Sequence, residues 1–159
     1  MKKYISLFVL FFIANFAHAA SDHLIEFRLV CEETQDDCEK YFEPNLEQDI
    51  WINKEVLLKD SDIKKVELEQ SAVNKENVML ILTFNDRGSK KLQEVTASNT
   101  GKRLAMFIMG AFHSASKIRE SIAGERVYIG EVGVQEANQI AATINADSNQ
   151  ELEEGMEEK

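Results

Sequence analysis

The chain has 159 residues, of which 44% are hydrophobic, and its 28 acidic and 18 basic residues give a formal net charge of −10. The basic residues are scattered singly or in pairs among acids, so the concentrated positive field needed to bind nucleic acid or an anionic membrane is missing. The length is that of one domain with its own core.

The N-terminal 19 residues are typical of an export signal. Lys2 and Lys3 precede a short apolar run, and the run ends at Ala17-His18-Ala19, a small-x-small cleavage pattern. As a helix, the run is shorter than the roughly 30 Å hydrocarbon core of a bilayer. We therefore expect cleavage after Ala19 and a periplasmic or secreted protein whose mature chain has no transmembrane segment. The alternative is an uncleaved, slightly short membrane anchor.

The chain has two cysteines, Cys31 and Cys38. Export would place them in an oxidising compartment, where neighbouring thiols are normally paired. We predict a disulfide between them, which would stabilise the protein by about 2 kcal/mol through the entropy of the unfolded chain. Two alternatives remain open: free thiols, or a metal site that adds His23 and His113, although no C-x-x-C spacing supports the metal.

Alternating side chains between His23 and Val30 predict a half-buried strand with Ile25 and Phe27 on its apolar face. The polar stretch from 32 to 39 predicts a loop. Tyr41-Phe42, just before the only proline, predicts a short turn at the edge of the core.

A hairpin is predicted for the next two apolar segments. The first runs from Ile63 to Val73, and the polar stretch 74–77 then turns the chain. The second, from Val78 to Phe84, is almost wholly apolar, which is typical of a central strand covered on both faces.

A helix is predicted from Asp86 to about Ser98. Asn85 is a suitable N-cap, because its side chain can accept a hydrogen bond from the first turn, and Asp86 adds negative charge at the positive end of the helix dipole. Gly88 would allow the first turn to approach its neighbours closely. Residues 99–101 provide the stop.

Two more strands and a second helix are predicted after this. Leu104 to Met109 and Ala111 to Ser114 form a hairpin that turns at Met109-Gly110, and Val127 to Ile129 is a short last strand. The second helix begins beyond Gly133. Its apolar residues recur at i, i+3, i+4 and i+7 and form one stripe that a sheet can cover: Ala137, Ile140, Ala141 and Ile144.

Residues 147–159 contain six acids and only two large apolar residues, so this segment is predicted to be a disordered acidic tail. Residues 20–146 then form one domain. The predicted class is α+β, with a mainly antiparallel sheet and two helices packed on one face, similar to a ferredoxin-like arrangement.

Several short blocks follow one another in a fixed order and spacing. They are LTFND at 82–86, GKRLA at 101–105, IRE at 118–120 and EAN at 136–138, with IEFRLV at 25–30 and EVLLKDSDI at 55–63 upstream. Together these blocks resemble the head subdomain of the first periplasmic domain of SecD, a subunit of the protein-export translocase.

The resemblance implies a non-catalytic interaction module that binds translocating or unfolded polypeptide, or an envelope or translocase partner. The residues it marks as candidate contacts are Lys102, Arg103, Arg119 and Glu120. Met109 joins them, because it puts an apolar residue at a hairpin tip where SecD usually has Asp-Gly. The alternative for the charged residues is that they are solvated or paired with one another.

Other functions follow from the same sequence. A secreted factor could use the SecD-like fold to bind an extracellular partner, and the oligomeric state is open. His113, Ser114 and Asp86 could form a hydrolytic triad, but no nucleophile elbow or oxyanion glycine accompanies them. We therefore expect no enzyme activity, no cofactor and no metal.

Overall fold

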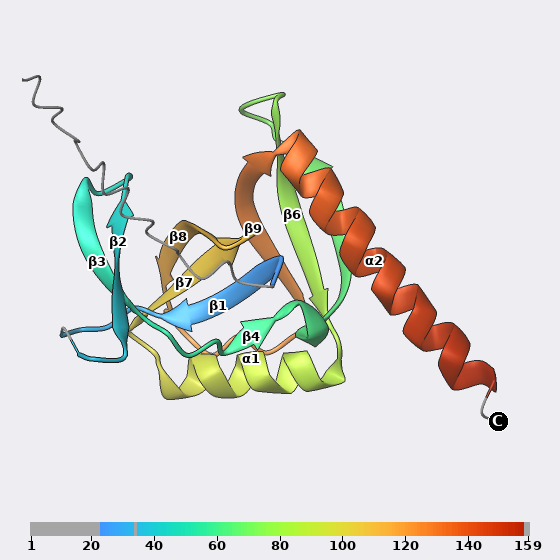
Figure 1. Ribbon diagram of the computed structural model, residues 1–159, viewed down its shortest axis with the longest axis horizontal. Coiled ribbons are helices and arrows are strands. Elements are labelled where there is room, and N and C mark those ends of the chain that lie inside the picture. Colours follow the sequence, from blue (N-terminus) through green and yellow to red (C-terminus); the bar gives the residue numbers. More distant parts are fainter. Residues whose placement is uncertain (1–22, 34, 158–159) are drawn as a thin grey trace, which may run out of the picture.

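The computed structural model describes residues 23–33 and 35–157 (Figure 1). The predicted export signal of residues 1–19 and its cleavage point lie outside the described residues. The elements, in chain order, are β1 (Ile25–Leu29), β2 (Cys38–Glu43), β3 (Gln48–Asn53), β4 (Leu58–Lys59), the 3₁₀ turn η1 (Asp60–Asp62), β5 (Ile63–Gln70), β6 (Asn77–Phe84), α1 (Asp86–Ser98), β7 (Arg103–Ile108), β8 (Ala111–Lys117), β9 (Arg126–Gly133) and α2 (Val134–Glu157).

The strands of the described residues form three antiparallel sheets, with the orders β4-β1-β7-β8, β2-β3 and β5-β6-β9. The predicted α+β class with antiparallel strands is confirmed, whereas the strands are divided among three sheets instead of one. The two larger sheets bury their apolar faces in one shared core, and both helices pack against its edges. Helix α1 contacts η1, β4 and β6, and α2 contacts β5, β6 and β9.

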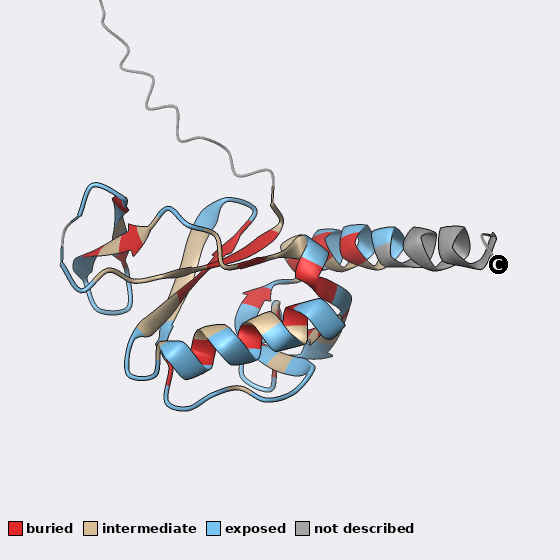
Figure 2. Cartoon of the chain, turned by 90° about the horizontal axis from the view of Figure 1, so that it is seen from below, coloured by how far each residue is buried: buried red, intermediate tan, exposed pale blue. Residues whose placement is uncertain are grey.

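The main core lies between the two larger sheets and is closed by one face of each helix. Figure 2 shows the buried residues on the inner sides of the helices and strands. The stripe predicted for the last helix is confirmed, because Ala137 and Ile140 are fully buried and Ile144 nearly so. Strands from both sheets supply the rest of this core, including Ile25, Leu80, Leu82, Met106 and Ile108.

A second, smaller core lies on the opposite face of β7. Ala105 and Phe107 point into it, and the β2–β3 hairpin contributes Ile50 and Ile52. The loop predicted for 32–39 is present up to residue 37, where β2 begins. The short turn predicted at Tyr41-Phe42 was wrong, because both residues lie in β2 of this hairpin. The two buried residues of β2 are Cys38 and Glu43. The burial pattern of β2 therefore differs from the simple alternation of apolar and polar residues that predicts a strand.

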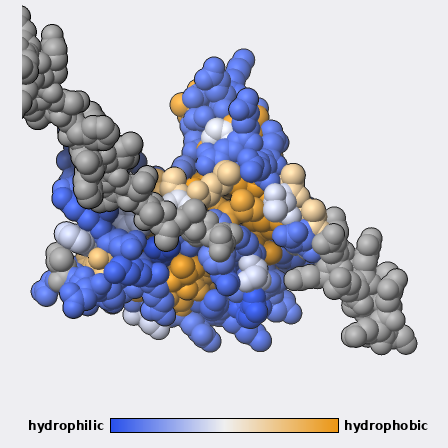
Figure 3. All heavy atoms as spheres, in the orientation of Figure 1, coloured by the Kyte–Doolittle hydropathy of each residue, from blue (hydrophilic) through white to orange (hydrophobic). Residues whose placement is uncertain are grey.

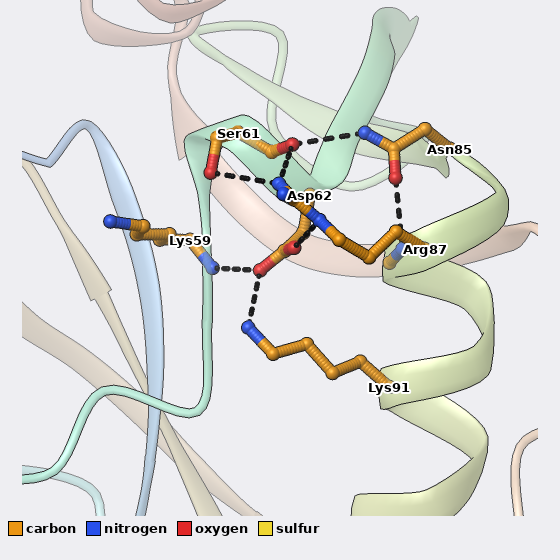
Figure 4. A network of polar contacts seen from close by, with 7 residues as sticks. Lys59, Ser61, Asp62, Asn85, Arg87 and Lys91 are labelled. Carbon is orange, nitrogen blue, oxygen red and sulfur yellow. Dashed lines mark hydrogen bonds and ion pairs between the residues drawn. The ribbon is translucent and has the colours of Figure 1, made fainter.

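The start of α1 is fixed by a polar network around Asp62, whose side chain is 1% exposed. Its carboxylate accepts hydrogen bonds from the Lys59 amide at 3.2 Å, Arg87 Nε at 3.2 Å and Lys91 Nζ at 3.1 Å (Figure 4). The predicted N-cap is confirmed, since Asn85 Oδ1 accepts from the Gly88 amide at 2.8 Å. A Cβ on Gly88 would lie 2.1 Å from the carbonyl oxygen of Asp62, so the close approach of this turn requires glycine.

Helix α2 continues through Glu157, past the residues that pack on the sheet, and Figure 1 shows this end extending away from the body. The sequence predicted a disordered tail from residue 147. The segment 147–157 contains no proline and is rich in Glu and Gln, which favour helix, so the backbone can continue the helix beyond its packed stripe. Within the described ranges, no helix is long and apolar enough to cross a membrane.

Candidate interaction site

The candidate contact residues lie at opposite ends of the β7–β8 hairpin. Met109 and Gly110 form its tip, with φ angles of 49° and 79° that are typical of a two-residue type I′ turn. Met109 is 42% exposed there. Because β7 has six residues, the opposite end of the hairpin is about 20 Å away.

Three of the charged candidates lie at that opposite end. Lys102 precedes β7, Arg119 and Glu120 follow β8, and the Ile118 amide donates to the Lys102 carbonyl at 2.9 Å, which brings the two segments side by side. All three side chains are exposed, and no ion pair within the described residues involves them. These candidate residues therefore lie in two separate groups, one at each end of the hairpin.

Arg103 differs from the other candidates, because its guanidinium is engaged within the domain. It forms a two-pronged ion pair with Glu43, in which Nη1 donates to Oε2 at 3.0 Å and Nη2 donates to Oε1. Nη2 also donates to the Ala115 carbonyl at 2.8 Å. Since Glu43 is only 4% exposed, Arg103 holds the end of β2 against β7 and β8.

The structure joins Cys31 and Cys38 in a disulfide with a Cα–Cα distance of 6.6 Å. Cys31 follows the bridge residue Val30, and Cys38 begins β2, so the disulfide fastens the start of the β2–β3 hairpin to the end of the β1 segment. Within residues 23–33 and 35–157, no group of three or more His, Cys, Asp or Glu side chains could hold a metal ion.

Aromatic rings fill the space beneath the β2–β3 hairpin. Tyr41 meets Phe107 edge-on at 5.0 Å between ring centroids, and Phe112 lies 6.1 Å from Tyr41. Burial raises the pKa of Tyr41 to about 12, and its hydrogen bond to Glu39 acts in the same direction. Arg28 lies over the Phe107 ring at 4.8 Å. These contacts make the hairpin a packed cover of β7 and β8.

One charged pair is buried beside these rings. The Glu26 side chain is 1% exposed and accepts a hydrogen bond from Arg28 Nη2 at 2.7 Å. A buried carboxylate needs such a partner because its desolvation is otherwise costly. Strand β1 therefore turns its apolar face toward the main core. Its other face, which carries the ion pair of Glu26 and Arg28, lies under the β2–β3 hairpin.

The hydrolytic triad considered from the sequence is not assembled by hydrogen bonds. His113 lies half-buried on β8, and no hydrogen bond among the described residues joins it to Ser114 or Asp86. Burial lowers the pKa of His113, and the negative charge of Glu136 opposes this shift. Burial therefore biases His113 toward its neutral form.

A shallow pocket of about 220 Å³ lies near the start of β1, between η1 and α2. Sequence reasoning did not predict it. Its central carboxylate, Asp60, accepts hydrogen bonds from the amides of Leu24 at 2.9 Å and Ile25 at 2.6 Å, so this side chain caps the first strand. The pocket is lined by His23, Lys59, Asp60, Ser61, Ile63, Ile144 and Asp147.

The surface of Figure 3 is mostly hydrophilic on the face shown, with apolar residues in the hollow between the strands and α2. Many of the exposed large apolar side chains lie in turns or near hairpin ends: Phe42, Leu46, Val73 and Met109, with Tyr128 on β9. Exposed apolar side chains thus occur at turns and hairpin ends in addition to the apolar region of this hollow.

Comparisons of this chain with known proteins all identify the same family. Residues 36–148 match a family model described as SecDF, P1 head subdomain. The chain is 43% identical over 68 residues to the protein translocase subunit SecDF of Thermus thermophilus, covering 42% of this chain and 9% of that protein. It is 33% identical over 100 residues to the protein translocase subunit SecD of Rickettsia typhi, covering 62% of this chain and 19% of that protein.

Solved structures agree with this result. A crystal structure of SecDF in a super-membrane-facing form matches with a TM-score of 0.58 and 27% identity, over 77% of this chain and 18% of that one. A structure of SecDF described as a membrane component that enhances protein export matches with a TM-score of 0.58 and 26% identity, over 77% of this chain and 62% of that one. The family match covers more than half of the chain, which therefore belongs to the SecDF P1 head subdomain family.

Proposed function

We propose that this domain is a non-catalytic interaction module in protein export that binds translocating or unfolded polypeptide. The observation that carries the proposal is the family match over residues 36–148, together with solved SecDF structures of which one is described as enhancing protein export. The chain spans 9% of the SecDF of Thermus thermophilus and 19% of the SecD of Rickettsia typhi, so the binding role is proposed for the head alone.

The site geometry supports contact at both ends of the β7–β8 hairpin. Met109 presents a flexible apolar side chain at one end, a residue type that adapts to varied partners. Lys102, Arg119 and Glu120 present mixed charge at the other end, which suits transient contacts of low sequence specificity. A module that meets many exported sequences needs such tolerance.

The experiment is site-specific photocrosslinking in living cells. A photoreactive amino acid is placed at Met109, Arg119 or Glu120, and for comparison at Val73, which is 91% exposed in the β5–β6 turn. We expect adducts with exported polypeptides or translocase subunits from the first three positions and few from Val73. If the hairpin positions yield no protein adduct, the proposed function is wrong.

The location of the protein is part of the same proposal. We propose a periplasmic protein, in line with the export signal predicted for residues 1–19. Cell fractionation tests this, because recovery in osmotic-shock fluid supports a role in export. Recovery in the culture medium instead would favour a secreted factor that binds an extracellular partner.

A further inference from the structure

The edge of the β5-β6-β9 sheet at β5 is closed by a side chain. Asn145 of α2 accepts from the Val66 amide at 2.8 Å and donates to the Val66 carbonyl at 2.9 Å, so it occupies both backbone groups that an added strand would use. Strand β5 also carries the charged residues Lys64, Lys65, Glu67 and Glu69. Charge and covered backbone groups are the usual protections of an edge strand.

The remaining sheet ends are protected in other ways, with one exception. Strand β9 carries Arg126 and Glu131, β4 has only two residues, and β2 carries Glu39, Lys40 and Glu43. The outer side of β3 is covered by the end of the β1 segment, because Val30 is bridged to Ile52 and the Cys31 amide donates to the Trp51 carbonyl at 2.8 Å. Strand β8 ends the four-stranded sheet and carries no Asp, Glu, Lys or Arg over its first six residues. Its sequence is AFHSASK, with four small residues, no proline and a single formal charge at Lys117.

Backbone pairing shows which groups of β8 point outward. The Ile118 amide bonds to the Lys102 carbonyl, and hydrogen-bonded and non-bonded pairs alternate along an antiparallel ladder. Two residues before Ile118 in this register, Ser116 therefore exchanges hydrogen bonds with β7. Lys117 and Ala115 belong to the non-bonded pairs. Their N–H and C=O groups therefore point away from β7, and no other strand in the described part of the chain pairs with them.

Residues 115–117 of β8 are at least partly accessible to solvent. Ser116 and Lys117 are exposed, and Ala115 is half-buried. Within residues 23–33 and 35–157, the outer edge accepts one side-chain bond, in which Arg103 donates to the Ala115 carbonyl at 2.8 Å. A carbonyl oxygen has a second lone pair. Among the described residues, no acceptor bonds to the amides of Ala115 and Lys117, which can therefore act as donors.

We infer that the outer edge of β8, at Ala115–Lys117, is a docking strand that pairs with an extended segment of exported polypeptide by strand addition. This inference rests on the proposed function and specifies where and how the polypeptide binds. Main-chain hydrogen bonds supply the attraction, so the partner needs an extended backbone more than a particular sequence.

The test uses a fluorescent nine-residue peptide of alternating Ser and Val with a Lys at each end. A second peptide has the same sequence with N-methyl groups on alternate residues, which removes the donors of one edge. Binding is measured by fluorescence anisotropy. We expect the first peptide to bind and the N-methylated peptide to bind about tenfold more weakly or not at all, as the loss of one or two hydrogen bonds predicts.

The matched variants are Lys117→Pro and Lys117→Ala. Both remove the same charge, but only proline removes the outward N–H, while the inward bond of Ile118 is left in place. We expect Lys117→Pro to weaken peptide binding about tenfold and Lys117→Ala to change it less than about twofold. Circular dichroism and thermal unfolding verify that both variants fold.

A measurement on the wild-type protein keeps the test independent of the variants. Peptide titration followed by NMR is expected to shift the amide resonances of Ala115 and Lys117 more than those of Val66 at the guarded edge. The inference of a docking strand is wrong if the peptide does not bind, or if Lys117→Pro binds it as tightly as the wild type. It is also wrong if the resonance shifts are centred elsewhere in the protein. Photocrosslinks at Met109 or Arg119 that persist in such a case would leave the proposed function standing, and their absence would remove it as well.

Discussion

The side chain of Asn145 on α2 makes both hydrogen bonds that a neighbouring strand would offer to Val66 on β5. A residue 79 positions away in the chain thus completes the sheet edge. Asn145 fixes the helix against the strand and at the same time prevents pairing with another chain.

Replacing Asn145 by Ala is expected to destabilise the protein by about 1–3 kcal/mol, because the two Val66 groups lose their partners. It should also promote concentration-dependent association through the uncovered edge of β5. Chemical denaturation and sedimentation velocity measure the two effects. Thr143→Ala is the control, since Thr143 is exposed and bonds only to the Gln139 carbonyl of its own helix. Equal behaviour of the two variants would show that Asn145 has no such role.

Gly88→Ala is expected to destabilise the protein, although a glycine-to-alanine change within a helix usually stabilises it. Alanine normally favours helix by about 1 kcal/mol, but here its Cβ would meet the Asp62 carbonyl at 2.1 Å. We expect a loss of about 3 kcal/mol or more, because the clash is with backbone and the first turn must move. Lys90→Ala on the exposed side of α1 is the control, and its effect should stay within about 0.5 kcal/mol. A neutral Gly88→Ala would contradict the close approach.

The ion pair between Arg103 and Glu43 should show measurable coupling. In a double-mutant cycle with Arg103→Gln and Glu43→Gln, we expect each single change to cost about 2 kcal/mol and the coupling free energy to exceed about 1 kcal/mol. The exposed pair of Arg126 and Glu67 is the comparison, with coupling of about 0–1 kcal/mol. Coupling no larger than that of the exposed pair would mean that Arg103 does not fasten the hairpin.

Protonation of His113 should destabilise the fold. Its pKa is lowered in the folded protein from 6.5 by burial, so the unfolded chain takes up the proton first as the pH falls. The stability associated with neutral His113 is fully present above pH 6.5 and is lost progressively below it, toward the lower folded pKa. We expect the melting temperature of the wild type to fall more steeply than that of His113→Gln between pH 7 and pH 5. Parallel curves over this interval would contradict the shift.

Local patterns were sufficient to predict much of the fold. The alternation around Ile25, the apolar run before Phe84, the cap at Asn85 and the stripe through Ile140 each indicated an element that the structure contains. These signals depend on neighbours within a few residues, so they are visible in the sequence. The division into separate sheets depends on which elements face each other, and no local pattern encodes it.

The β2–β3 hairpin shows why other parts could not be predicted. Glu43 is buried, and a buried glutamate looks like a surface residue until its partner, Arg103, 60 positions later, is known. Arg103 was selected as a contact residue by family resemblance, whereas its geometry ties it to the fold. The backbone N–H and C=O groups of β8 that point outward could not be predicted either, because they follow from the pairing register of the strands and not from side-chain chemistry.

Strand β7 contributes buried side chains to both cores, with Ala105 and Phe107 on one side and Met106 and Ile108 on the other. If either layer opens alone, β7 stays held by the opposite one. We therefore expect the amide protons of β7 that bond to the central strand β1 to be among the slowest to exchange with solvent.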